Sequence, residues 1–333
     1  MALTDQENIR EGLGGAERRR FLEARIGAVE RVWAPRAVRS ENGVGAGRRQ
    51  IELRYLGGLD VTIEPDQFLD LGEAAWRGRP VSFVPPSTSV RAENWGRRWQ
   101  GGLLTTCGLS AVGRAAPEDG GMHGRAHLIP ASVTRQDGSW THGGGYELVV
   151  RGTLREGAVF EQNLTVDRTI RARHGVSEIH ISDVIRNEGF VPDRVRILYH
   201  INIGWPMLHA GASVSADASE PGATEASGWS RQLGDPEPDV PERVNALVAI
   251  PDPDGWSHAT IAGDSGSLTV RFRPDQLPYL TVWRSGTSGS YALGIEPGTC
   301  WPSHADGPDE GKVGRLLGPG ESFAVELVLG FGD

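Results

Sequence analysis

Two polar residues lie in local contexts that suit proton transfer. His200 lies in an apolar run, and Asn202, two residues on, would share its face of a strand. Buried polar side chains are costly unless they are paired or used, although a structural histidine bonded to a backbone carbonyl is the plain alternative. Glu296 directly precedes Pro297, which favours an extended backbone and predicts a carboxylate at the end of a strand. An ordinary glutamate at the rim of a sheet is the alternative there.

A third candidate, His123, lies among glycines, with Gly121 and Gly124 close on either side. Glycines let a loop approach a ligand closely, although a solvent-exposed loop histidine is the alternative. With His200 and Glu296, this residue completes a set of two imidazoles and one carboxylate. We expect the three side chains to converge on one concave groove.

A run of aromatic and basic residues at 94–109 supplies candidates for substrate contacts. It holds two Trp and two Arg beside a Gly-Gly pair, and a His-Gly-Arg follows at residues 123–125. Indole faces, guanidinium groups and amides suit a sugar, although core packing is the usual fate of a Trp in a strand. If the run is a strand, only one of Arg97 and Arg98 reaches the site. The expected contacts are His123, Arg125, Asn202, Asn94, Trp95, Arg98 and Trp283.

The composition excludes several classes of protein. The chain has 333 residues, of which 46 are Gly and 21 Pro, and this favours a turn-rich β protein. Its net charge of −9 argues against a nucleic-acid partner. The only two cysteines, Cys107 and Cys300, form no Cys-x-x-Cys pair. With no signal-peptide pattern and no membrane-spanning apolar run, we expect a soluble cytoplasmic protein with a small-molecule partner, and a homodimer is left open.

The periodicity predicts an N-terminal helical segment, residues 1–35, followed by one β domain, residues 36–333. A helix is expected from residue 4 to about 32, with an apolar stripe interrupted by Gly14-Gly15. From residue 49 the period changes to two, and short strands follow one another with antiparallel spacing. Two stretches, 110–145 and 211–243, are expected to be mostly loop, and the second is expected to cover a site. Strands are expected at 51–55, 61–63, 146–154, 158–170, 177–186, 195–203, 246–250, 267–272, 279–283, 291–295 and 322–329.

Four motifs in this order resemble the galactose mutarotase-like superfamily, which includes the aldose 1-epimerases. They are the Trp-x-Arg to Cys-Gly-Leu run at 95–109, the Met-His-Gly-Arg at 122–125, the Leu-Tyr-His-x-Asn-x-Gly at 198–204 and the Gly-x-Glu-Pro at 294–297. The resemblance is greatest to a bacterial branch of uncharacterised aldose 1-epimerase family proteins. It covers roughly residues 25–331.

The resemblance implies a large antiparallel β-sandwich with the site in a groove across one sheet. It implies that His200 is the general acid, that Glu296 is the general base and that His123 is a sugar ligand. The implied activity is the interconversion of sugar anomers by ring opening, with no cofactor and no metal. One residue departs from the pattern, because Gln67 stands where the branch has an Arg. The identity of the sugar is therefore open.

Two other functions use the same residues. His123, His200 and Glu296 would also make a two-His, one-carboxylate set for a metal-dependent sugar isomerase or lyase. The sequence lacks the close His-x-His pair of cupin-like metal sites, and this favours a mechanism without a metal. A non-catalytic carbohydrate-binding protein is the third alternative, and the presence of both His200 and Glu296 argues against it.

Overall fold

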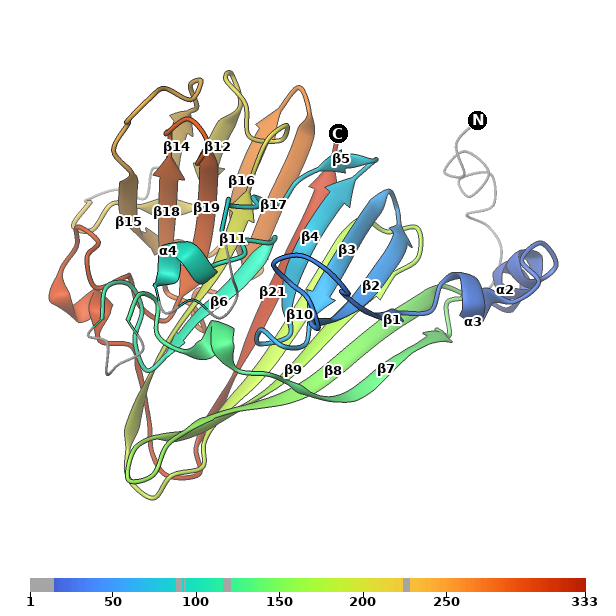
Figure 1. The fold of residues 1–333 in the computed structure, drawn as a ribbon, viewed down its shortest axis with the longest axis horizontal. Helices are drawn as coiled ribbons and strands as arrows, with labels where there is room; N and C mark the ends of the chain where they lie inside the picture. The colour runs from blue at the N-terminus through green and yellow to red at the C-terminus, as the bar shows by residue number, and fades with distance from the viewer. Residues whose placement is uncertain (1–14, 88–91, 93, 116–120, 224–227) are drawn as a thin grey trace.

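Antiparallel sheets form the protein, as the sequence predicts, and the described residues contain three of them. The computed structural model describes residues 15–87, 92, 94–115, 121–223 and 228–333. Figure 1 shows a sheet of five strands and a sheet of seven strands lying over a larger sheet of nine strands. The largest cluster of buried apolar side chains extends from Val29 to Phe331 and fills the space between the sheets. The all-β prediction is confirmed.

The two smaller sheets carry the strands nearest the site. The five-stranded sheet consists of β1 (Arg36–Arg39), β2 (Arg49–Leu56), β3 (Leu59–Glu64), β4 (Asp70–Trp76) and β5 (Arg79–Pro80), in that order. The seven-stranded sheet has the order β13 (Ala218–Ser219), β15 (Arg243–Ala249), β18 (Tyr279–Ser285), β19 (Ala292–Gly298), β11 (Asp193–Ile203) and β20 (Arg315–Leu317), and β6 (Leu104–Leu109) also pairs with β11.

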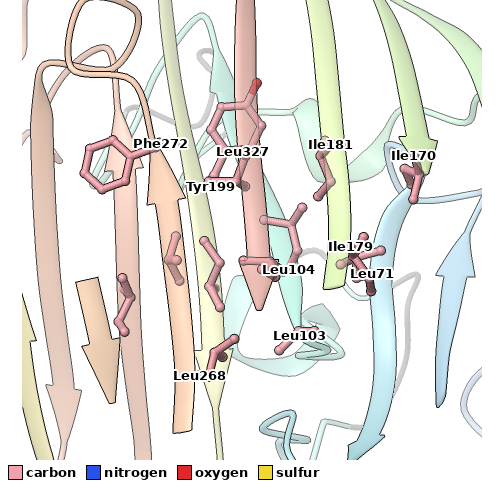
Figure 2. Packing of buried hydrophobic residues seen from close by; sticks show 14 of the residues in the cluster. Leu71, Leu103, Leu104, Ile170, Ile179, Ile181, Tyr199, Leu268, Phe272 and Leu327 are labelled. Carbon is pink, nitrogen blue, oxygen red and sulfur yellow. The ribbon is translucent and has the colours of Figure 1, made fainter. Parts of the chain in front are cut away.

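The nine-stranded sheet forms the back layer. Its order is β14 (Trp229–Gln232), β12 (Ser213–Ala216), β16 (Ser257–Gly263), β17 (Gly266–Phe272), β21 (Ser322–Gly332), β10 (Glu178–Asn187), β9 (Asn163–Arg173), β8 (Tyr146–Gly157) and β7 (Ser132–Trp140). Its inner face packs against both smaller sheets. Figure 2 shows Leu327 of β21 and Tyr199 of β11 among the buried residues of this interior.

In the described residues, helices are few and short. They are α2 (Gly15–Glu23), α3 (Val29–Val32), α4 (Trp95–Arg98), and the 3₁₀ turns η2 (Ala126–Leu128) and η3 (Asp309–Lys312). The predicted N-terminal helix begins outside the described residues, and its described part is divided into two helices. Trp33 anchors this segment, because its ring stacks on His174 at 3.4 Å between centroids. In the described part of the chain, no helix is long and apolar enough to cross a bilayer.

Two local predictions are wrong, and one condition is not met. Residues 95–98 form helix α4, so the argument that would apply to a strand there does not hold. The predicted loop 110–145 contains β7, an edge strand on which no residue is buried, so its sequence carries no apolar alternation. The predicted loop 211–243 contains the short strands β12, β13 and β14. Strand β16 was also missed, because two of its three buried alternating positions are the small residues Ser257 and Ala259.

A buried ion network ties the layers together. Arg168 of β9 is fully buried and donates to both oxygens of Asp183 on β10, at 2.9 and 2.7 Å. It also donates to Asp70 of β4 at 2.6 Å and to Thr106 of β6 at 3.0 Å. Tyr199 of β11 donates to Asp183 at 2.7 Å. The network therefore fixes β6 and β11, whose opposite faces carry the residues described below.

Asp70 should make the stability of the protein depend on pH. Burial raises the pKa of this carboxyl from 3.8 to about 6, although Arg168 and Thr106 oppose the rise. Because the pKa of Asp70 is higher in the folded protein than in the unfolded chain, protonation of this carboxyl stabilises the fold. This contribution is fully present below pH 3.8 and is lost as the pH rises through about 6. Between pH 5 and 7 we expect the wild type to lose about 1 kcal/mol relative to Asp70→Asn. Urea denaturation at both pH values measures this, and equal pH dependence of the two proteins would contradict it.

Candidate active site

A row of four polar side chains crosses the outer face of the seven-stranded sheet. Thr281 of β18 lies opposite Glu296 of β19, and His200 of β11 lies opposite Thr105 of β6. The β11–β19 register pairs Leu198 with Gly298 and Ile201 with Ile295, and this sets His200 directly opposite Glu296. Cross-strand neighbours share a face and lie in side-chain contact. The row is therefore Thr281, Glu296, His200 and Thr105.

His200 and Glu296 form a close pair in the centre of this row. Nε2 of His200 lies 3.0 Å from Oε1 of Glu296, and the two side chains are 7% and 1% exposed. The contact does not have hydrogen-bond geometry, and it is an ion pair only when His200 is protonated. Glu296 lies within β19, whose last residue is Gly298, so the predicted strand end after Glu296 is off by two residues.

Three atoms on the floor of the site have unmet hydrogen-bonding capacity. Among the described residues, Nδ1 of His200, Oε1 of Glu296 and Oγ1 of Thr281 are buried with no hydrogen-bond partner. Buried polar atoms in folded proteins nearly always have partners. Three such atoms in one row are what a site for a polar, hydroxyl-bearing ligand would present.

His123 enters the site from the loop after β6. Its backbone has a φ of 62°, and the flanking Gly121 and Gly124 are also in the left-handed region. The ring accepts a hydrogen bond from the backbone N–H of Gly113 at Nδ1, 3.3 Å away. Burial lowers the pKa of His123 well below its ordinary value, and the neighbouring His200 lowers it further. We assign a neutral ring that carries its proton on Nε2 and can donate to a ligand.

Indole rings form the walls of the pocket. The rings of Trp95 and Trp99 are stacked at 5.8 Å between centroids, and Trp283 meets Trp99 edge-on at 6.4 Å. Trp95 also lies 5.1 Å from the His123 ring, and Trp283 lies 5.5 Å from the His200 ring. The enclosed volume is about 150 Å³. The lining residues are Trp95, Trp99, Met122, His123, His200, Glu242, Val244, Thr281, Trp283, Glu296, Pro302 and His304.

The structure brings together five of the residues singled out from the sequence. His123, His200, Glu296, Trp95 and Trp283 all line this pocket, although they come from distant parts of the chain. These five residues are referred to below as the predicted pocket set.

The four other predicted contacts lie elsewhere. Asn202 is fully buried on the same face of β11 as His200, and its amide donates to the carbonyls of Gly102 at 3.1 Å and His200 at 2.9 Å. Arg98 lines a neighbouring cavity. Asn94 is exposed before α4, and Arg125 is half-buried outside the pocket lining. Period two predicts the strand face on which Asn202 lies, but its amide N–H groups are used within the protein, by the two carbonyls and by Oγ1 of Thr105 at 3.4 Å.

Sequence reasoning missed Glu242 and His304. Glu242 accepts a hydrogen bond from Nε1 of Trp283 at 3.0 Å and lies directly before β15. It comes from a Pro-rich acidic stretch in which no local pattern distinguishes it. His304 accepts from the backbone N–H of Arg114 at 3.3 Å, and burial lowers its pKa. Both residues reach the pocket only through the fold of the loops.

The close packing of His200 against Glu296 requires a glycine at position 294. A Cβ atom there would overlap Oε1 of Glu296 and lie 2.9 Å from Cε1 of His200. Gly294→Ala should therefore displace both groups and lower kcat/KM on an accepted substrate about 10²-fold, with little change in thermal stability. Gly27→Ala is the matched control, because no atom lies within 4 Å of a Cβ at that position. Full activity of Gly294→Ala would contradict the proposed geometry.

The pocket has no evident metal cage. In the ranges that the structure describes, no group of three or more His, Cys, Asp or Glu is arranged to hold a metal ion. His123 and His200 have ring centroids 5.8 Å apart in an edge-to-face arrangement. The two-His, one-carboxylate alternative is tested by experiment below.

Solved structures with the same fold carry the names of sugar epimerases. A candidate aldose 1-epimerase from Klebsiella pneumoniae is 23% identical with a TM-score of 0.75, over 87% of this chain and 81% of that one. A galactose mutarotase-like protein from Clostridium acetobutylicum is 12% identical with a TM-score of 0.62, over 86% and 96% of the two chains. Galactose 1-epimerase from Lactobacillus acidophilus is 13% identical with a TM-score of 0.60, over 89% and 98%. The fold is therefore galactose mutarotase-like.

The comparisons by sequence give a family without an assigned activity. A family described as a domain of unknown function (DUF4432) matches residues 45–330. No curated protein matches the sequence. The sequence identities to the solved structures are low, so these structures show the fold and not the function. The function is inferred from the pocket.

Proposed function

The chain belongs to the DUF4432 family, and from the geometry of its pocket we propose that it is an aldose 1-epimerase-like isomerase that interconverts sugar anomers. The observation that carries this proposal is the contact between His200 and Glu296, with Nε2 and Oε1 at 3.0 Å on the floor of an aromatic pocket. An acid and a base at adjoining positions suit one class of reaction in particular.

Anomer exchange needs an acid and a base side by side. The anomeric hydroxyl and the ring oxygen of a pyranose are bonded to the same carbon, so the groups that serve them must lie close together. Glycoside hydrolysis, by contrast, usually separates its two carboxyl groups by about 5 Å or more. The 3.0 Å contact supports the first arrangement.

The proton transfers balance over one cycle. Glu296 takes the proton of the anomeric hydroxyl while the His200 imidazolium gives a proton to the ring oxygen. The bond between C1 and the ring oxygen breaks, its electron pair goes to that oxygen, and C1 becomes an aldehyde. After rotation about C1–C2, the C5 hydroxyl attacks the other face, His200 takes its proton and Glu296 returns one to the carbonyl oxygen. No cofactor is consumed.

The rest of the predicted pocket set would bind the sugar. Trp95 and Trp283 offer indole faces on two sides, and such faces stack on the apolar face of a pyranose. His123 would donate from Nε2 to a hydroxyl, because its Nδ1 already accepts from Gly113. Glu242 would accept from another hydroxyl while Trp283 holds it in place.

Nuclear magnetic resonance tests the activity. Exchange between α and β anomers should be accelerated for at least one sugar in a panel of free aldoses, uronic acids and keto-sugars. Acceleration of none would overturn the proposal and leave the non-catalytic binding protein as the alternative.

Chelation separates the metal-free mechanism from the metal-dependent one. We expect the exchange rate on the accepted sugar to survive exhaustive dialysis against a chelator, because proton transfer by His200 and Glu296 needs no metal. Loss of activity that Mn²⁺, Fe²⁺ or Zn²⁺ restores would instead favour a metal-dependent isomerase or lyase.

A further inference from the structure

A second and larger cavity adjoins the candidate active site. Its volume is about 350 Å³, more than twice the 150 Å³ of the catalytic pocket. Small-molecule sites usually enclose about 300 Å³ or more, so the catalytic pocket alone is small for one, whereas the two cavities together are not. Polar residues are frequent in the lining, and they include Arg48, Glu64, Gln67, Gln100, Thr105 and His127.

Trp99 forms a wall between the two cavities and lines both of them. Its Nε1 donates to Oγ1 of Thr105 at 3.0 Å, and Thr105 lies opposite His200 in the β6–β11 ladder. The second cavity therefore begins one strand away from the catalytic pair. A ligand too large for the catalytic pocket could extend past this indole ring.

His127 is a buried polar side chain of the second cavity with unmet hydrogen bonds. It is 4% exposed, and within the described part of the chain neither ring nitrogen has a hydrogen-bond partner. The ring is held edge-on against Trp95, 4.6 Å between centroids. Burial, and then the charge of Arg98, lowers the pKa of His127 to about 3. The neutral ring offers one donor and one acceptor, which is the pattern that hydroxyl groups match.

The lining of this cavity carries charges of both signs, Arg48 and Arg98 beside Glu64, Asp70 and Glu73. Arg48 donates to Glu64 at 2.6 Å and to Gln67 at 2.7 Å, and Gln50 donates to Glu64 at 2.8 Å. The guanidinium group of Arg48 is thus neutralised within the wall. A neutral ligand rich in hydroxyl groups fits such a lining better than a phosphate or a carboxylate does.

We propose that this cavity is a subsite for a second sugar unit, so that the protein acts on the reducing end of a disaccharide or longer glycan. The proposal rests on the proposed epimerase function, because it places the reducing unit over His200 and Glu296. The next unit lies beyond Trp99, with hydroxyls on His127 and on the amides of Gln67 and Gln100.

Matched sugars test the subsite. Anomer exchange is measured for glucose and galactose, and for maltose, cellobiose, lactose and gentiobiose. We expect kcat/KM for at least one disaccharide to exceed that for its own reducing-end monosaccharide by tenfold or more. Binding of the corresponding methyl glycosides, which cannot open their rings, is followed in parallel by saturation-transfer spectroscopy.

Two variants address the cavity itself. His127→Phe keeps the ring against Trp95 but removes both nitrogens, and should lower the disaccharide-to-monosaccharide ratio of kcat/KM about tenfold. Val44→Trp changes an exposed wall residue and should lower the same ratio by obstructing the cavity. His142→Phe is the control, because this histidine is exposed in the turn between β7 and β8.

The outcomes distinguish the two proposals. Exchange of monosaccharides with no disaccharide preference, unaffected by His127→Phe and Val44→Trp, would overturn the subsite and leave the epimerase proposal standing. Disaccharide glycosides that bind in a His127-dependent way without anomer exchange would support the subsite and overturn the epimerase proposal. A disaccharide preference that both variants reduce supports both.

Discussion

Glu296→Gln should lower kcat for anomer exchange by about 10²–10⁴-fold, because general-base catalysis typically contributes that much. The amide keeps the shape of the side chain beside His200 but cannot take a proton. Sugar affinity should change little, so the loss should appear in kcat and not in KM. The exchange rate at several sugar concentrations, measured by nuclear magnetic resonance, separates the two parameters.

His200→Asn should give a loss of similar size, since the acid and the base act in the same step. Glu161→Gln is the matched control, because Glu161 is an exposed glutamate in the turn between β8 and β9. A loss confined to KM in either pocket variant would show that the residue binds the sugar without transferring a proton, and would contradict the assigned role.

Arg168→Met should destabilise the fold by about 3–5 kcal/mol, because it leaves the buried carboxylates of Asp70 and Asp183 without their countercharge. Methionine fits the space of the aliphatic stem but makes none of the five hydrogen bonds of the guanidinium group. Chemical denaturation measures the loss.

Arg171→Met is the matched control on the same strand. Its guanidinium group lies 4.0 Å from Glu147 and its side chain is 40% exposed, so its removal should cost about 1 kcal/mol or less. Equal losses in the two variants would contradict the view that the buried network holds the layers together.

Much of the fold could be predicted because many strands bury one face. Strand β10 alternates between buried and more exposed residues along most of its length, and its sequence shows the same alternation. Strand β7 does not, because it lies at the sheet edge and no residue on it is buried. The four-residue helix α4 is too short to show a helical period in the sequence.

The site was predictable to the extent that its polar residues contrast with their neighbours. His200 and Glu296 lie in apolar strands and His123 among glycines, so each stands out locally. Which strands lie side by side is decided by pairing across the whole chain, and no local pattern shows that β11 lies between β19 and β6. The positions of Glu242 in the candidate active site and of Arg98 in the neighbouring cavity depend on that pairing. The sequence alone therefore does not show them.

Anomer exchange in D₂O tests the central claim most directly, because ring opening removes no hydrogen from carbon. The account predicts that an accepted sugar exchanges its α and β signals while its hydrogen on C2 keeps full intensity, and that Glu296→Gln stops the exchange. Loss of the C2 hydrogen signal to deuterium would show enolisation instead. That result would contradict the assignment of His200 and Glu296 as the acid and base of sugar ring opening.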